Sequence, residues 1–268
     1  MASAQLAGHP EAHTCARLLL DAATGTRYAH LLAPDDELSP EQTAQLSDWL
    51  NRAKSGEPLP YILGSAPFYG RTWRVESGVL IPRPETELLV EAVLQNAPKG
   101  AKIADLGTGS GIIAGTLALE RRDFQLFATE VSPDARRVAQ RNWDELGAQV
   151  ELLVGRESDW LGPIQPLAPF NAIVSNPPYI PSRAIEALQA SVRDFEPRLA
   201  LDGGEDGLNP YRPIARNGRD SLRDAGFVAL EVGHDQRDSI QELFGDWARF
   251  AWKTDFQGIA RVALAWKS

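Results

Sequence analysis

The sequence predicts an α/β protein in which a small helical domain precedes a parallel sheet covered by helices on both faces. From residue 101 onward, strand-like apolar segments alternate with helical segments, a pattern typical of parallel sheets. The part of the chain before about residue 60 shows instead the apolar spacing of helices. With 268 residues, of which 43% are hydrophobic, the chain is long enough to bury a sizeable core in one large or two modest domains.

Composition argues against several classes of protein. No apolar run approaches the roughly 18–20 residues that a membrane span needs, and the first residues lack the basic start and apolar core of a secretory signal, so we expect none. A single cysteine, Cys15, allows no internal disulfide and no cysteine-cluster metal site, which favours a reducing, cytoplasmic setting. The net charge of -9 disfavours a protein whose main role is to bind nucleic-acid phosphates. We therefore expect no membrane contact, no metal and no direct binding of nucleic acid.

Residues 1–70 are predicted to form the helical domain. Its first helix lies in EAHTCARLLLDAA. A second helix begins after Ser39 as the cap, with Pro40 at its first position, and ends near Gly56. The apolar spacing of the first helix places four residues on one buried face, namely Cys15, Leu18, Leu19 and Ala22.

Residues 71–98 are predicted to connect the two parts of the chain. Alternating apolar residues indicate a β-hairpin through Trp73, Val75, Val79 and Ile81. A helix follows from about Pro84. Residues 99–268 then form the α/β domain, with strands expected in AKIADLG, FQLFATE, QVELLVG, FNAIVSN, FVALEV, ARFAWKT and ARVALAWK.

A glycine-rich loop lies between the first strand of this domain and the helix that follows. Glycines there let the backbone turn sharply and approach a ligand, and the helix start adds exposed N–H donors. The dinucleotide pattern G-x-G-x-x-G is not matched, because the third glycine comes one position early. Asp105 suits either a group that organises the loop or one that receives the cationic end of a ligand. The loop consists of Asp105, Leu106, Gly107, Thr108, Gly109, Ser110 and Gly111.

An acidic residue, Glu130, ends the next predicted strand. A carboxylate at this place in an α/β sheet can accept hydrogen bonds from both hydroxyls of a ribose. Together with the glycine loop, Glu130 predicts that the ligand contains a nucleoside, without indicating which one.

The fourth predicted strand runs directly into Asn176, Pro177, Pro178 and Tyr179, at the edge where parallel strands bind ligands. The two prolines remove two backbone donors and fix φ. The carbonyl groups of this corner and the Asn176 side-chain oxygen can therefore face outward as rigid acceptors. Such a pair suits a planar NH₂ group on an sp² carbon, and Tyr179 would cover the flat face of that amide or base.

This corner favours methylation of nitrogen. The NH₂ lone pair is delocalised, so the nitrogen is a poor nucleophile until both N–H groups are held by acceptors. These hydrogen bonds strengthen as positive charge develops on nitrogen in the transition state, and no strong general base is needed. The other requirement is alignment of the nitrogen, the methyl carbon and the departing sulfur.

The combination of DLGTGSG and NPPY resembles the class I S-adenosylmethionine-dependent methyltransferases that modify NH₂ groups. The segments LPYILG, FYG, VLIPRPETE, NPPYIP, FEPRLALDGGEDGL and ALEVGHDQ closely resemble the protein-(glutamine-N5) methyltransferases of peptide chain release factors, the HemK/PrmC family. The resemblance covers nearly the whole chain from about Pro58. It implies a Rossmann-like, seven-stranded, mainly parallel sheet after a helical bundle and a β-hairpin linker.

The resemblance also implies the reaction and its site. Methyl would pass from S-adenosylmethionine to the glutamine amide of the GGQ motif in class 1 release factors, leaving S-adenosylhomocysteine. Gly107 to Gly111 would face the methionine part of the cofactor, Glu130 the ribose and Trp160 the adenine, and Asn176 would lie where cofactor and substrate meet. Asn176 and the Pro177 carbonyl would hold the glutamine amide, with Pro178 and Tyr179 beside it. The substrate pocket would be lined by Phe68, Arg83, Glu85, Thr86 and Glu87. The enzyme is expected to act as a monomer.

Other functions share some of these features. The same acceptors suit a glutamine of a ribosomal protein or the amino group of adenine in nucleic acid, although adenine requires base flipping and a basic surface. A nicotinamide-dependent oxidoreductase would share the glycine loop and Glu130, but not the proline corner. A scaffold that binds a translation factor without catalysis is a further alternative. The IPRPETE segment favours the release factor enzymes, by resemblance alone.

Overall fold

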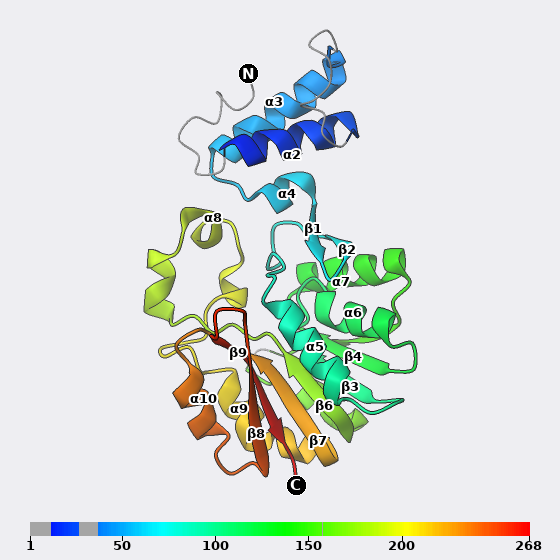
Figure 1. Cartoon of the computed structure of the whole chain (residues 1–268), viewed down its shortest axis with the longest axis vertical. Coiled ribbons are helices and arrows are strands. Elements are labelled where there is room, and N and C mark those ends of the chain that lie inside the picture. Colours follow the sequence, from blue (N-terminus) through cyan, green and yellow to red (C-terminus); the bar gives the residue numbers. More distant parts are fainter. Residues whose placement is uncertain (1–11, 27–36, 157) are drawn as a thin grey trace.

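The structure of the chain, a computed structural model, describes residues 12–26, 37–156 and 158–268. Its centre is a seven-stranded sheet with strand order β5-β4-β3-β6-β7-β9-β8 (Figure 1). All neighbouring pairs from β5 to β7 are parallel, and β9 alone runs against its neighbours. The expected mainly parallel sheet is therefore confirmed. The strands are β3 (Lys102–Leu106), β4 (Gln125–Glu130), β5 (Val150–Val154), β6 (Phe170–Ser175), β7 (Leu222–Glu231), β8 (Arg249–Thr254) and β9 (Ala260–Trp266).

The direction of winding reverses between β3 and β6. The chain proceeds outward from β3 to β4 and β5, then returns to the centre and continues outward through β6 and β7 on the other side. In doubly wound sheets, ligands bind beyond the carboxyl ends of the strands at such a switch point. The glycine loop follows β3 and the NPPY corner follows β6, so the fold brings both to this place.

Helices cover both faces of the sheet (Figure 1). One face packs against α5 (Thr86–Asn96), α6 (Ile112–Glu120) and α7 (Pro133–Leu146), and the other against α9 (Tyr211–Asn217) and α10 (Arg237–Leu243). Successive strand residues alternate between the two cores, as the pleat requires. In β6, for example, Ala172 and Val174 enter the first core and Ile173 the second.

The N-terminal part contains α2 (Ala12–Thr24), α3 (Pro40–Lys54) and α4 (Leu59–Leu63), which share a separate small core. The predicted start of α3 is confirmed. Ser39 Oγ accepts from the backbone N–H of Gln42, and the Gln42 side chain accepts from the backbone N–H of Ser39, which is a complete capping box.

The buried face of α2 differs from the predicted one. Cys15 and Leu19 are buried as expected, but Leu18 is only partly buried and Ala22 is exposed. The buried stripe instead continues through Ala16 and Ala23. This stripe is rotated by about one residue because α3 and α4 contact that side of the helix.

The hairpin lies earlier in the chain than predicted. It consists of β1 (Ser65–Phe68) and β2 (Arg71–Arg74), so it crosses the expected boundary at residue 71, and Val79 and Ile81 lie outside any strand. The reason is the Tyr69-Gly70 turn, whose residues both have positive φ, at 49° and 70°. A two-residue turn of this kind closes a tight hairpin.

The remaining helical segments are short and lie in the connections between strands. None of the helices within the described residues is both long and apolar enough to cross a membrane. The short segments are η2 (Gly162–Leu167), η3 (Ser182–Ala187), α8 (Ala190–Arg193), η4 (Arg198–Ala200) and η5 (Gly218–Ser221).

Candidate active site

A cavity of about 860 Å³ opens at the carboxyl ends of β3, β4 and β6, at the switch point of the sheet. The glycine loop and Glu130 form part of its wall, and Asn176 and Pro178 form another part. The segment before α5 and the loop that follows β6 complete it. Residues predicted to bind a nucleoside and residues predicted to hold an NH₂ group thus line one cavity.

The glycine loop adopts a conformation that favours glycine. Gly107, Gly109 and Gly111 have φ of 71°, 59° and 83°, in the left-handed region. At Gly111 a β-carbon would lie 2.7 Å from Trp143 Nε1, and the same indole nitrogen donates to the Gly111 carbonyl over 2.8 Å. Close packing of α7 therefore requires this glycine, which lies behind the cavity wall.

Asp105 holds the glycine loop from beneath. Its Oδ2 atom accepts from Thr108 Oγ1 over 2.6 Å and from the backbone N–H of Ala114 over 3.2 Å. The side chain is fully buried, and Oδ1 finds no partner among the described residues. This burial raises the pKa of Asp105 to about 7. Of the two roles expected for Asp105, these contacts match the organisation of the loop.

Glu130 faces the cavity at the end of β4. Its Oε2 accepts from the backbone N–H of Gly109 and its Oε1 from that of Ser132, over 2.8 and 2.9 Å. A carboxylate can accept about four hydrogen bonds, so each oxygen keeps a lone pair for a ligand hydroxyl. Trp160 also lines the cavity, with its ring edge beside Gly107, where a β-carbon would lie 3.2 Å from it.

The NPPY corner contains two acceptors without a donor among the described residues, and Asn176, which carries one of them, lines the cavity. Asn176 Nδ2 donates to Thr86 Oγ1 over 3.2 Å. No donor from the described residues reaches Asn176 Oδ1 or the Pro177 carbonyl, and neither proline has an N–H group. The Tyr179 carbonyl, by contrast, accepts from Gln236 Nε2 over 3.0 Å. Burial raises the pKa of the Tyr179 phenol to about 12, so this group stays protonated at neutral pH.

A glycine segment after the corner packs against it, a contact that the sequence alone does not indicate. Ile180 pairs with the 201–204 segment through the backbone N–H groups of Ile180 and Gly203. A β-carbon on Gly203 would lie 2.8 Å from the Pro178 carbonyl, and one on Gly207 would overlap the Tyr179 carbonyl. The glycine spacing in LDGGEDGL is also that of an ordinary turn, so the contact is recognised only once the loop is seen to fold back on the corner.

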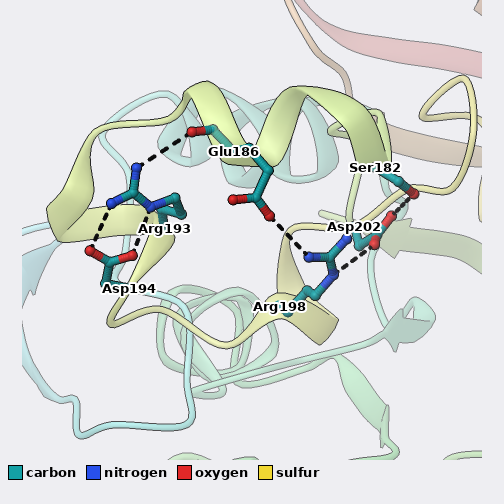
Figure 2. Close-up of polar contacts among 6 residues, drawn as sticks. All are labelled: Ser182, Glu186, Arg193, Asp194, Arg198 and Asp202. Atoms are coloured by element: carbon teal, nitrogen blue, oxygen red, sulfur yellow. Dashed lines mark hydrogen bonds and ion pairs between the residues drawn. The ribbon is translucent and has the colours of Figure 1, made fainter.

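The loop between Ser182 and Asp202 is folded by polar contacts (Figure 2). Ser182 Oγ lies 2.5 Å from Asp202 Oδ1, and Arg198 bridges Asp202 at 3.1 Å and Glu186 at 3.7 Å. Arg193 pairs with Asp194 and donates to the Glu186 carbonyl. Solvent screens exposed pairs of this kind, so they contribute little to the stability of the loop.

The stronger anchor of this loop is Glu196. Its buried carboxylate accepts from Arg83 Nη2 over 2.5 Å and from the backbone N–H of Ile81 over 3.1 Å. Arg83 also donates to the Ile81 carbonyl. The contact joins the segment before α5 to the loop after β6, two walls of the same cavity.

The five residues expected to line the substrate pocket lie in different places. Arg83 and Thr86 line the cavity, but Phe68, Glu85 and Glu87 do not. Phe68 is buried in the first core because the hairpin turns it inward beside Trp73. Glu87 accepts from the backbone N–H of Tyr69, and Glu85 is the residue that precedes α5.

Some of the residues predicted to bind the cofactor or to act in catalysis line the cavity, and the others lie outside its wall. Asp105, Gly111 and Tyr179 do not line the cavity and support its wall through the contacts already described. Pro177 is buried and does not line the cavity either, and its carbonyl has no donor among the described residues. The predicted residues on the wall are Gly107, Thr108, Gly109, Ser110, Glu130, Trp160, Asn176 and Pro178.

This sheet, with a glycine loop and a proline corner on the two sides of its switch point, is that of a class I methyltransferase. Solved structures share the fold: a methyltransferase from Pyrococcus furiosus is 18% identical with a TM-score of 0.56, covering 85% of this chain and 98% of that one. A T. thermophilus 16S rRNA methyltransferase, solved with AdoMet and guanosine, is 19% identical with a TM-score of 0.53, covering 76% of this chain and 50% of that one.

Sequence comparisons define the family. Residues 1–64 match the PrmC N-terminal domain and residues 84–204 the Methyltransferase small domain. A release factor glutamine methyltransferase from Koribacter versatilis is 40% identical over 98% of this chain and 94% of its own length. Another, from Neisseria gonorrhoeae, is 40% identical over 93% of this chain and 91% of its own. The chain belongs to the release factor glutamine methyltransferase family.

Proposed function

We propose that this protein transfers a methyl group from S-adenosylmethionine to the side-chain amide nitrogen of the GGQ glutamine in class 1 peptide chain release factors. The products are N5-methylglutamine and S-adenosylhomocysteine. One observation carries the proposal beyond family membership: Asn176 Nδ2 is engaged by Thr86, while Asn176 Oδ1 and the Pro177 carbonyl have no donor among the described residues. Two acceptors of this kind match the two N–H groups of a primary amide.

The residues of the cavity fit S-adenosylmethionine, which when bound supplies a methyl group on a positively charged sulfur. The left-handed glycines of the loop leave room for the methionine part, and Gly109 has open space where a β-carbon would project. Glu130 keeps lone pairs for the ribose hydroxyls, and the half-buried ring of Trp160 suits the adenine. This assignment needs no metal.

Catalysis then depends on holding a weak nucleophile. Asn176 Oδ1 and the Pro177 carbonyl accept from the amide NH₂ of the substrate and direct its nitrogen toward the cofactor. When bound, the cofactor would supply the methyl group, with a nitrogen–carbon bond replacing the sulfur–carbon bond. These acceptors would stabilise the positive charge that develops on nitrogen. One N–H proton is released to water afterwards. Tyr179 packs beside the amide and is no base, because its phenol stays protonated.

We propose the following division of the chain. Residues 1–70 form a substrate-recognition domain, residues 71–98 a connector and residues 99–268 the methyltransferase domain. One glutamine side chain offers little specificity, so the helices α2 and α3 are assigned a second contact with the release factor. The enzyme acts as a monomer in the cytoplasm, on the release factor protein and without binding nucleic acid.

The test is to incubate the full-length protein with S-adenosylmethionine and a class 1 release factor, and to map methylation by mass spectrometry. We expect a single added methyl on the GGQ glutamine. A parallel incubation with ribosomal proteins and with an adenine-containing oligonucleotide tests the alternatives. Methylation of either of those, with an unmodified release factor, would contradict the proposed substrate.

A further inference from the structure

Thr86 lies between Asn176 and a buried acid. It is the first residue of α5, and its side chain is almost fully buried at the cavity wall. Its hydroxyl accepts from Asn176 Nδ2 over 3.2 Å and lies beside the buried carboxylate of Glu231, whose pKa it lowers. A hydrogen bond from this hydroxyl to Glu231 would connect the three side chains in a series that ends at the acceptor corner.

The sheet places Glu231 beside the corner. Ser175 of β6 pairs with Leu230 of β7, so the next residues, Asn176 and Glu231, are neighbours at the ends of adjacent strands. Glu231 is 3% exposed, and its Oε2 atom has no partner among the described residues. It does not line the cavity. A buried carboxylate with so few partners is costly, and this invites a functional explanation.

We infer that Glu231, acting through Thr86, fixes the orientation of the Asn176 carboxamide so that Oδ1 faces the substrate amide. An ionised carboxylate can only accept, so the single proton of the Thr86 hydroxyl must be donated to Glu231. That hydroxyl can then only accept from Asn176, which turns Nδ2 toward Thr86 and Oδ1 away from it. Glu231 and Thr86 are thus positioning residues. The inference rests on the proposed function for its catalytic consequence.

The direction of the hydrogen bonds between Glu231, Thr86 and Asn176 depends on the charge of Glu231. A protonated carboxyl could donate to Thr86, which would then donate to Asn176 Oδ1 and turn Nδ2 toward the substrate. Two NH₂ groups would face each other, and the acceptor pair would be lost. Activity should therefore fall as the pH drops through the pKa of Glu231.

The groups around Glu231 determine the pH at which its carboxylate gains a proton. Burial raises its pKa to about 7, and the nearby Glu85 acts in the same direction. The Thr86 hydroxyl and the charges of Arg261 and Arg83 act in the opposite direction. The Tyr211 phenol donates to the backbone carbonyl of Glu231, and the charge of Glu231 also influences the Tyr179 phenol. Both phenols have raised pKa values, so they remain neutral across this range.

The experiment compares Thr86→Val, which removes the hydroxyl while keeping the shape, with Thr86→Ser, which keeps it. We expect Thr86→Val to lower kcat for release factor methylation about 10- to 100-fold, with the Kd for S-adenosylhomocysteine changed less than about twofold. Thr86→Ser should restore most of kcat. The acidic limb of the kcat–pH profile, that is the fall in kcat as the pH drops through the pKa of Glu231, should be present in the wild type and absent in Thr86→Val. A matched control is Thr116→Val, because the buried Thr116 hydroxyl has no partner among the described residues and lies outside the cavity wall.

A second measurement needs no substrate. In the ¹⁵N-labelled full-length protein, the side-chain NH₂ signals of Asn176, identified by their loss in Asn176→Ala, should titrate with Glu231 near neutral pH. The titration should persist in Thr86→Ser and vanish in Thr86→Val. Asn176 signals that do not titrate in the wild type would overturn the inference, as would an unchanged kcat or a retained acidic limb in a folded Thr86→Val. If the signals titrate as expected but no release factor is methylated, the proposed function fails and the positioning role of Glu231 stands.

Discussion

The backbone N–H of Gly109 donates to Glu130 Oε2 over 2.8 Å, so the glycine loop and the acid at the end of β4 form one unit. Glu130 therefore shapes the loop and lines the cavity at the same time. Two segments that lie 21 residues apart in the sequence are thus linked directly.

Loss of this carboxylate should weaken cofactor binding. Glu130→Ala removes the acceptor for the ribose hydroxyls and for the N–H of Gly109, and hydrogen bonds to a charged group contribute about 1.5–3 kcal/mol. We expect the Kd for S-adenosylhomocysteine to rise about 10- to 100-fold in isothermal titration calorimetry. Glu151→Ala, an exposed acid on the neighbouring strand, is the control. An affinity equal to that of the control would show that Glu130 does not contact the ligand.

Asn176 should matter for turnover more than for cofactor affinity. Asn176→Ala removes one of two acceptors whose contribution grows in the transition state, and loss of one such group costs about 100- to 1000-fold in kcat. The Kd for S-adenosylhomocysteine should stay within a few-fold of the wild type. Asn96→Ala, at the far end of α5, serves as the control. Equal losses of turnover and cofactor affinity would assign Asn176 to cofactor binding instead.

The packing of α7 against the glycine loop predicts a large stability effect. In Gly111→Ala the new methyl group would lie 2.7 Å from Trp143 Nε1 and 3.0 Å from the Ala139 β-carbon. Overpacking and left-handed strain together should lower the free energy of unfolding by about 3 kcal/mol or more. Gly100→Ala shares the positive φ, at 68°, but meets no atom within 4 Å, so it should cost only about 1–2 kcal/mol. Urea unfolding measures both, and equal losses would contradict the proposed clash.

Stability should also depend on the charge of Asp105. The pKa of Asp105 in the folded state, about 7, lies above the ordinary value of 3.8. As the pH rises, the folded state therefore keeps the Asp105 proton to a higher pH than the unfolded state does. The contribution of Asp105 to stability is therefore lost as the pH rises from about 4 to 7 and stays lost above that. Asp105→Asn should flatten this part of the stability–pH curve, measured by urea unfolding. Asp224→Asn, an exposed acid, should leave the slope unchanged.

The sequence predicted the features that depend on local pattern. Alternating strands and helices gave the parallel sheet, and Ser39 with Pro40 marked the start of α3. Glu130 and Asn176 could be placed on one cavity because the carboxyl ends of parallel strands share one edge of the sheet.

Features that depend on contacts between distant segments were beyond a single sequence. Phe68 was assigned to the pocket, but the side to which it points depends on the Tyr69-Gly70 turn. The contact of Gly203 with the Pro178 carbonyl arises only when the loop folds back on the corner. Glu231 ends its strand as an ordinary acidic residue in the sequence, and only the pairing of β6 with β7 shows that it neighbours Asn176.

The reversal of winding between β3 and β6 separates, along the chain, the segments proposed to bind the methyl donor from those proposed to bind the acceptor amide. The residues assigned to the methyl donor, apart from Asn176, lie in or after β3, β4 and β5, whereas the acceptor corner follows β6. Substitutions in the segments after β6 should therefore change the choice of acceptor amide while leaving most donor residues in place.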